Sequence, residues 1–375
     1  MTLTETSKTV RRGIIGSIFI IILYYISIII IIPLTKDFFA KMFPPKDPPT
    51  PIYGVLPALE FVKKEIKNDA PPTFKLDTKT GKLPDDNPKK MTVYKFQKPI
   101  PSFEKGESAV NTAKEFGFVD LDLITSLKES TYKWKNLLSG GTMEINTNTK
   151  EFIINVPIAG KGELFSRGML SYAGVTKQAT DLLKKIGRDQ DPLYKEATNK
   201  ISLGKIVNTR IQQIDNINDA QLARIDFFRK IDKYPILGPD PIKGLINFTV
   251  RKYNEKYPVY NYPFAEYHVW TIETQSNATY PIIPINDAWE ILKNNKAVIT
   301  NVTPKNEGNL NDYSPVRIES VFINNIYLAY YDSTSMQEYL QPIWVFDGTY
   351  TTSGTQGGTI SFYYPAVSAE YIKLP

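Results

Sequence analysis

The chain has few residues that could carry out chemistry through a ring nitrogen or a sulfur atom. It contains one histidine, His268, and no cysteine. A histidine or thiolate metal site needs several such ligands, so the sequence excludes one. A Ser–His–Asp triad would have to use His268, but the chain has no G-x-S-x-G nucleophile turn. His268 lies in an aromatic stretch between Tyr267 and Trp270, and we expect it to pack within a strand or to lie on its surface.

Asp347 is the carboxylate with the most suggestive neighbours. It follows the apolar stretch YLQPIWVF and precedes Gly348, and the glycine-rich segment SGTQGGT follows at 353–359. Apolar residues on both faces predict a buried strand at 339–346, and Asp-Gly is a strong turn signal. We therefore interpret Asp347 as a turn residue and the glycine-rich segment as the loop tip. A catalytic carboxylate in an anchored hydrolase is the alternative.

Three other patterns resemble known motifs without completing them. Asp215, Asn216, Asn218 and Asp219 form an oxygen-rich segment, but the glycine and the terminal glutamate of an EF-hand loop are missing. The segment SGGT at 139–142 lies between expected strands, which is not the context of a phosphate-binding loop. Three glycosylation sequons, close to the number that chance would produce in this Asn- and Thr-rich chain, begin at Asn247, Asn277 and Asn301. The sequence thus predicts no catalytic, cofactor-binding or metal-binding residue.

The charge balance is only mildly basic. Lysine and arginine number 45 against 39 acidic residues, a net charge of +6, and three of the cations lie within the first twelve residues. No basic block stands out elsewhere, so we do not expect the chain to bind nucleic acid. Without cysteine the fold has no disulfide and depends on core packing. Twenty-seven prolines and many Tyr, Thr and Asn residues favour a β-rich fold with many turns.

One segment is apolar enough to cross a lipid bilayer. Residues 13–34 carry no charge, and as a helix they would span about 33 Å. The run is longer than the core of a signal peptide and no small-x-small cleavage site follows, so we expect an uncleaved anchor. Basic residues precede it within 1–12, which predicts a short cytoplasmic tail and an extracellular or periplasmic C-terminal part.

The remaining chain divides into a spacer and two expected domains. Residues 35–90 form a linker with six prolines between Pro44 and Pro57, which suits a stiff spacer. A first α+β domain is expected at 91–187, with an amphipathic helix near 104–117, a hairpin at 142–157 and a second helix at 166–186. A second, larger β-rich domain is expected at 188–375.

The second domain repeats the order of elements in the first. PINDAWEILKNNKAVI at 284–299 predicts a short helix with Asn286 or Asp287 as N-cap, and three strand candidates follow it. A helix followed by an antiparallel meander therefore occurs near 104–157 and again near 284–367. The fold class predicted is α+β, with one transmembrane helix and an ectodomain of two helix-plus-antiparallel-sheet units. Tyrosines that suit protein recognition gather in the last third, at Tyr327, Tyr330, Tyr331, Tyr339, Tyr363 and Tyr364.

The order AWEILKNN, IYLAYY, LQPIWVFDG, a glycine-rich hairpin and SFYYPAV resembles that of bacterial YycH/YycI-type regulatory proteins with PepSY-like repeats. The resemblance covers 284–367 well and the first unit loosely. It implies a non-enzymatic, membrane-anchored ectodomain that acts on a partner membrane protein, often a sensor kinase. The ending YYPAVSAE and the region 161–275 depart from the family pattern, so no site residue carries over.

These observations predict a membrane-anchored extracytoplasmic protein that is not an enzyme and has no cofactor. It would bind the bilayer through residues 13–34 and would regulate or scaffold an envelope partner, such as a sensor kinase. A structural component of the cell envelope or surface that self-associates into a homo-oligomer is the alternative.

Overall fold

A computed structural model describes residues 17, 24–25, 48–85, 87–99, 105–124, 130–166, 168, 171–190, 192–195, 197–276, 278–305, 310 and 313–373. The chain divides into two units, Met1–Pro49 and Thr50–Pro375. No helix of the described residues is long and apolar enough to cross a membrane. The expected anchor at 13–34 lies outside the described residues except for Ser17, Tyr24 and Tyr25, which are helical. The expected cytoplasmic tail, 1–12, also lies outside them.

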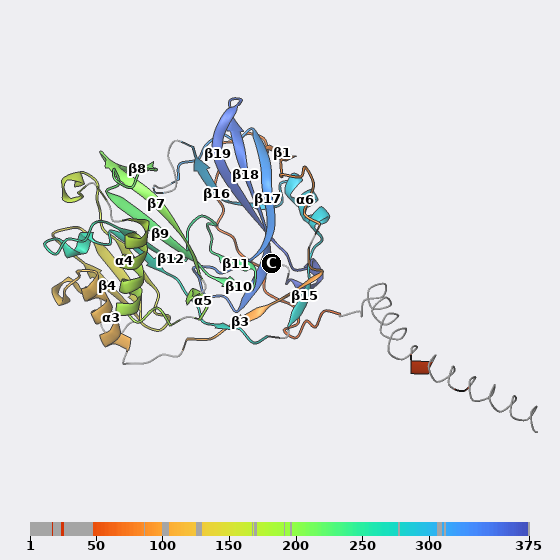
Figure 1. Cartoon of the computed structure of the whole chain (residues 1–375), viewed down its shortest axis with the longest axis horizontal. Helices are drawn as coiled ribbons and strands as arrows, with labels where there is room; N and C mark the ends of the chain where they lie inside the picture. The colour runs from red at the N-terminus through yellow and green to blue at the C-terminus, as the bar shows by residue number, and fades with distance from the viewer. Residues whose placement is uncertain are drawn as a thin grey trace, which may run out of the picture. The chain divides into compact units, whose positions relative to one another are not determined.

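The second unit is strand-rich, and its described part is mixed α+β, as the sequence predicts (Figure 1). Its largest helices are α3 (Lys105–Glu115), α4 (Tyr172–Lys185) and α6 (Ile285–Lys293), and α5 (Pro192–Lys195) is a single turn. Short 3-10 turns occur at Asp120–Asp122, Gly162–Leu164, Pro258–Tyr260 and Ala369–Tyr371. The strands form two large sheets and one small one.

An eight-stranded antiparallel sheet lies beneath two of the helices. Its strands follow in spatial order as β4 (Thr131–Lys135), β5 (Thr142–Asn146), β6 (Phe152–Asn155), β13 (Phe264–Tyr267), β12 (Ile246–Val250), β9 (Leu222–Phe228), β7 (Thr198–Val207) and β8 (Arg210–Ile214). Helices α3 and α4 lie on one face of this sheet (Figure 1). Their apolar residues form one core with it.

A nine-stranded sheet contains the C-terminal strands. Its main order is β10 (Lys230–Ile231), β11 (Tyr234–Leu237), β17 (Ser320–Tyr331), β18 (Tyr339–Thr352), β19 (Thr355–Pro365) and β16 (Val298–Pro304). Three short strands pair at its borders: β1 (Thr73–Leu76) on β17, β3 (Tyr94–Phe96) on β18 and β14 (Ile272–Glu273) on β3. The small third sheet pairs β2 (Lys90–Thr92) with β15 (Thr279–Pro281).

The expected helices form, with two corrections at their starts. The first helix ends before Gly117, which has φ +83°, and the second ends before Gly187, which has φ +64°. The second begins at Tyr172 rather than near 166, because the Ser171 side chain accepts a hydrogen bond from the Gly174 amide and caps the helix there. Neither Asn286 nor Asp287 caps α6, since the helix already begins at Ile285 after Pro284.

The interpretation of Asp347-Gly348 as a turn is wrong. β18 continues through both residues to Thr352, and the hairpin turns at Ser353 and Gly354, whose φ values are +49° and +75°. Gly348 instead allows the backbone of β17 to approach β18 closely. A Cβ atom there would lie 2.2 Å from the carbonyl oxygen of Phe322, beside a register shift between Ile323 and Asn325. Only glycine fits at such a bulge.

Strands from the two predicted domains occur together in each of the two large sheets. β4, β5 and β6 lie before the boundary predicted at 187/188, and their sheet continues into β13, which lies far behind it. β3, expected to open the first domain, pairs with β18 near the end of the chain. Sequence-local periodicity identifies each strand and its two faces, but it carries no information on which distant strand becomes the neighbour.

Candidate functional site

The two faces of the eight-stranded sheet differ in polarity. Along β9, the alternating residues Ala223, Ile225 and Phe227 belong to the apolar core beneath the helices. Arg224 and Asp226 alternate with them and therefore project from the opposite face. Both are buried all the same, and Asp226 has no exposed surface. The polar side chains of this central strand are thus removed from water.

Strand pairing aligns the polar face into two rows that run across the strands. One row contains Ile153, Glu266, Asn247, Asp226 and Lys200, which are direct partners from β6 to β7. The next row contains Asn155, Phe264, Thr249, Arg224 and Ser202. Directly opposite residues on neighbouring strands are close enough for their side chains to interact. The register therefore brings together side chains from five segments of the chain.

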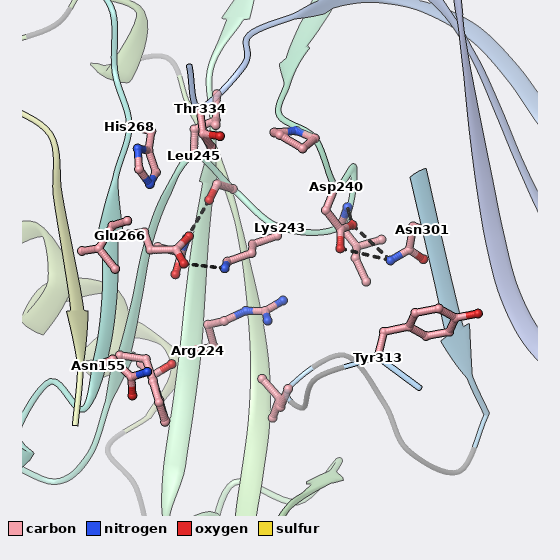
Figure 2. A pocket seen from close by; sticks show the side chains of 18 of the residues that line it. Asn155, Arg224, Asp240, Lys243, Leu245, Glu266, His268, Asn301, Tyr313 and Thr334 are labelled. Carbon is pink, nitrogen blue, oxygen red and sulfur yellow. Dashed lines mark hydrogen bonds and ion pairs between the residues drawn. The ribbon is translucent and has the colours of Figure 1, made fainter. Parts of the chain in front are cut away.

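A cleft of about 890 Å³ opens over these rows. Its other walls come from the connection Pro239–Leu245, from Asn301, Val302 and Thr303 of β16, and from Lys64 and Tyr313. Figure 2 shows Glu266, Lys243 and His268 on one side, Asp240, Asn301 and Tyr313 on the other, and Arg224 between them. The volume lies in the range of small-molecule and cofactor sites, and the mixture of apolar walls with a few polar groups is typical of them.

Glu266 and Lys243 form an ion pair on one wall. The Lys243 ammonium lies 2.7 Å from Glu266 Oε1, and the Asn247 amide nitrogen donates to Glu266 Oε2 at 3.2 Å and to the Gly244 carbonyl at 2.8 Å. Burial by itself raises the pKa of Glu266, but the charge and hydrogen bond of Lys243 and the hydrogen bond from Asn247 outweigh it, so this pKa is lowered. Glu266 is therefore ionised at neutral pH.

Arg224 is held from behind by Asp226. Its Nε donates to Asp226 Oδ2 at 2.9 Å, and the Gly244 amide donates to Asp226 Oδ1 at 3.0 Å. Burial raises the pKa of Asp226, while Arg224 and the Gly244 amide oppose the rise. Gly244 is required at this point, because a Cβ atom would lie 2.7 Å from the backbone of Phe227. This close contact between Gly244 and the backbone of Phe227 holds in place the connection Pro239–Leu245, which forms one wall of the cleft.

Asp240 is fixed on the opposite wall. Asn301 Nδ2 donates to both of its carboxylate oxygens, at 3.1 and 3.2 Å, and the Ile242 amide donates at 3.1 Å. Burial raises the pKa of Asp240, and the Ile242 amide, Lys64, Asn301 and Arg224 partly oppose this. Asp240 thus connects the loop after β11 to β16 and lies within the electrostatic influence of two cleft cations.

A polar row of the nine-stranded sheet leads away from Asn301. Asn301 pairs with Ser361, and Ser361 pairs with Asp347. The Ser361 hydroxyl donates to Asp347 Oδ1 at 2.7 Å. Burial raises the pKa of Asp347, and the hydrogen bonds from Ser361 and Tyr327 oppose the rise. Asp347 does not line the cleft, so the structure places it in the sheet as a buried, hydrogen-bonded group.

His268 is part of the cleft. It is buried, its Nδ1 lies 3.3 Å from Glu151 Oε1, and its backbone amide donates to the Leu245 carbonyl at 2.8 Å. The sequence predicts that this residue packs within a strand or lies on its surface. The structure places it directly after the end of β13, buried at the cavity wall.

The partial motifs have structural roles. Asn216 Nδ2 donates to Asp219 Oδ2 at 3.0 Å, and Asn216 Oδ1 accepts from the Asn218 amide, so the oxygen-rich segment is a turn between β8 and β9. Within the described residues, no group of three or more His, Cys, Asp or Glu side chains could hold a metal ion. SGGT and SGTQGGT both lie at hairpins.

The glycosylation sequons and the six C-terminal tyrosines lie largely in the interior of the fold. Asn247 and Asn301, which begin sequons, are buried in the cleft, where a glycan would not fit, and Asn277 lies outside the described residues. None of the six C-terminal tyrosines is exposed: three of them are buried and three are half-buried. Their rings take part in edge-to-face contacts such as Tyr331 with Tyr363, with centroids 6.0 Å apart.

A second surface feature is an apolar tip beside β4. Leu121 and Leu138 are 97% and 99% exposed, and Leu137 is nearly as exposed. Asp122 connects the two loops that carry them, because its Oδ2 accepts from the Val119 amide at 3.0 Å and from Asn136 Nδ2 at 3.1 Å. Exposed leucines close together are uncommon on a soluble surface.

Sequence reasoning does not identify the cleft residues. In the sequence, Arg224 and Glu266 resemble the solvated face of amphipathic strands and Lys243 resembles a loop residue, and only the pairing of distant strands brings the three together. The available signal is the density of charge in β9, β12 and β13 and their connections, which is consistent with one polar face but does not reveal its burial.

No family model matches the chain, and no curated protein matches it. Among solved structures, the chain is similar to the crystal structure of an uncharacterized protein from Eubacterium rectale ATCC 33656. The two are 11% identical, the match covers 78% of this chain and 88% of the other, and the TM-score is 0.43.

Proposed function

We propose that the chain is a membrane-anchored, extracytoplasmic, non-enzymatic protein that binds an envelope partner in the cleft and so regulates or scaffolds it. The observation that carries the proposal is the cleft itself, a ligand-sized cavity whose polar groups are held in place by partners within the chain. Pre-positioned hydrogen-bonding groups among apolar walls favour recognition of a ligand.

The Glu266–Lys243 pair of the cleft suits binding better than proton transfer. A general acid or base works best with a pKa near the operating pH, whereas the pKa of Glu266 is lowered and its carboxylate is ion-paired with Lys243. Asp240 holds its position through three hydrogen bonds to Asn301 and Ile242. These contacts orient the carboxylates as fixed acceptors.

The membrane part of the proposal rests on the uncharged run at 13–34 and the basic residues before it. The resemblance of 284–367 to YycH/YycI-type regulators supports a membrane protein, such as a sensor kinase, as the partner. The compact unit begins at Thr50, directly after the prolines at 44–45 and 48–49, which would connect it to the anchor.

Site-specific photocrosslinking in cells tests the proposal. A benzophenone amino acid is placed in the full-length chain at Ile153, which is 45% exposed on the cleft wall. The matched control is Tyr172, which is 49% exposed on α4 over the opposite face of the same sheet. We expect position 153 to capture one membrane or envelope protein and position 172 to capture none.

Other outcomes contradict the proposal in distinct ways. Equal capture from both positions would show that the cleft is not the binding site. Capture of a second copy of the chain from position 153 would favour the self-associating structural component. Replacing 13–34 with an unrelated apolar helix separates the anchor from the cleft: capture should persist if the cleft alone determines the partner.

A further inference from the structure

The apolar tip beside β4, formed by Leu121, Leu137 and Leu138, contributes nothing to the interior of the fold. All three side chains are exposed, and none of them belongs to a hydrophobic core cluster. Transfer of exposed apolar side chains from water into an apolar environment is favourable. The tip is therefore suited to contact with an apolar phase or surface outside the chain.

The loop between β4 and β5 holds its two leucines in fixed positions. The Asn136 amide donates to the Gly141 carbonyl at 2.8 Å, and the Gly140 amide donates to the Asn136 carbonyl at 2.9 Å. Asn136 Oδ1 also accepts from the Ser139 amide at 2.9 Å and from the Ser139 hydroxyl at 2.8 Å. Because these polar groups have partners within the loop, they stay paired when the loop leaves water.

Leu121 is held beside the same loop. Leu123 and Trp134 form an antiparallel bridge, and the Ile124 amide donates to the Lys133 carbonyl at 2.9 Å. Continuing this antiparallel register along the chain places Leu121 next to the loop that follows β4. The leucines of the two loops thus form one projecting group.

The carboxylates next to the leucines already have partners. Asp120 forms an ion pair with Lys114 at 3.3 Å, and Asp122 is buried and accepts two hydrogen bonds. Lys135, at the end of β4, is exposed and belongs to none of the ion pairs within the described residues. A lipid phosphate at a membrane surface would give Lys135 an anionic partner.

A lipid bilayer fits these features better than a protein surface. A stable protein interface buries about 800 Å² on each partner around an apolar centre. Here the most exposed apolar groups are three leucines that project from two loops, and charged groups lie directly beside them. Projecting leucines with a lysine behind them suit insertion to a depth of about 5–10 Å, at the boundary between lipid headgroups and acyl chains.

We propose that the apolar tip inserts into the surface of a lipid bilayer, as a second membrane contact in addition to the expected anchor at 13–34. The leucines would enter the boundary of the acyl chains, and Lys135 would meet a lipid phosphate. The inference rests on one part of the proposed function, the anchor that keeps the chain at a bilayer, and it does not depend on the cleft.

Fluorescence quenching tests the proposal on the full-length chain in phosphatidylcholine vesicles. The chain contains no cysteine, so a single Leu138→Cys change allows attachment of one nitrobenzoxadiazole label. Val207→Cys, at an exposed apolar position on β7, is the matched control. We expect nitroxide-labelled lipid to quench the label at 138 about twofold and to leave the label at 207 unchanged, because quenching requires insertion among the lipids.

Further variants assign the quenching to the tip. In the chain labelled at 138, adding Leu121→Gln and Leu137→Gln should remove the quenching, and the fold should persist because both side chains are exposed. Phosphatidylglycerol in the vesicles should strengthen the quenching, and Lys135→Gln should cancel that gain. Thermal unfolding of each variant confirms that it is folded.

Equal quenching at 138 and 207, or no quenching at 138, would overturn the inference. An unquenched label whose emission shifts to the blue only at high protein density would assign the leucines to a contact with a second copy of the chain. Flotation of the vesicles separates these results from the proposed function. A chain that floats with the vesicles without quenching at 138 contradicts only the role of the tip, whereas a chain that does not float contradicts the anchor as well.

Discussion

The two faces of the central strands β9 and β12 of the eight-stranded sheet are both buried, but by different means. On the face beneath α3 and α4, Phe248 packs with Phe116 and Phe152, at ring-centre distances of 6.5 and 6.4 Å. On the cleft face, Asn247 and Arg224 of neighbouring strands are buried as well. An antiparallel sheet commonly leaves its polar face in water. Here that face forms the wall of a cleft.

The difference shows that the helix face stabilises the fold, whereas burial of polar groups on the cleft face costs free energy. Apolar burial stabilises the helix face in proportion to its area. On the cleft face, each polar group must regain in the protein the hydrogen bonds that it loses to water. Asp226 does so through Arg224 and Gly244, and Asn247 does so through Gly244 and Glu266. Such a face stabilises little, which agrees with a role in binding.

The largest effect is expected on the helix face. Phe248→Ala should lower the free energy of unfolding by about 4 kcal/mol, because it removes a fully buried ring from the aromatic cluster and leaves a cavity. Urea denaturation measures the change, and Val207→Ala, at an exposed position, is the control. A loss below about 1 kcal/mol would mean that this face does not carry the main core.

On the cleft face, Asp226→Ala should cost somewhat less, about 3 kcal/mol, because it removes the buried carboxylate that binds Arg224 Nε and the Gly244 amide. Asp226→Asn is the matched variant: it keeps an acceptor for the Gly244 amide, so a smaller loss is expected. If both variants unfold at the same urea concentration as the parent, the ion pair does not stabilise this face.

Asp347→Asn tests the polar row of the other sheet through pH. Burial raises the pKa of Asp347, so the folded chain holds this proton at a higher pH than the unfolded chain does. The ionised carboxylate therefore costs stability at neutral pH, and the cost disappears as the pH falls through the folded pKa towards about 3.9. We expect the variant to be more stable than the parent at pH 7, with the advantage shrinking at acid pH in urea titrations.

An advantage that stays constant with pH would contradict burial as the cause. The same variant also tests the hydrolase alternative, since a catalytic Asp347 would lose turnover across a broad substrate screen.

Glu266→Gln should show the smallest effect and the opposite dependence on pH. The pKa of Glu266 is lowered, so its ionised form stabilises the folded chain above the unfolded pKa, and that contribution is lost as the pH falls through the folded pKa. The partly exposed pair with Lys243 should contribute about 0.5 kcal/mol at pH 7. Parent and variant should converge in acid, and Lys293→Gln, from a more exposed pair on α6, is the control.

Much of the local structure can be predicted from the order of residues. The alternation of Ala223, Ile225 and Phe227 predicts both the strand and its buried face, and Gly117 and Gly187 mark helix ends. Asp347-Gly348 fails, because the same dipeptide that favours a turn also serves where a facing backbone comes too close for a Cβ atom. Local chemistry does not distinguish these two uses of glycine.

The candidate site depends on pairings that no local pattern contains. β6 pairs with β13, and β9 connects β12 to β7, so Glu266, Asn247 and Asp226 become neighbours only in the folded sheet. The connection that carries Asp240 and Lys243 follows β11, a strand of the nine-stranded sheet, and forms another wall of the cleft.

The sequence by itself determined the class of this protein: α+β, rich in strands, without thiol chemistry, and with an apolar run at 13–34 that predicts an anchor. These properties follow from composition and from periodicities of a few residues. Only the tertiary structure decided that the polar side chains on β9 and β12 of the eight-stranded sheet are buried, and that β16 and the loop after β11 form the other walls of the cleft. Burial is a property of what packs against a strand, and that neighbour lies tens to hundreds of residues away in the chain.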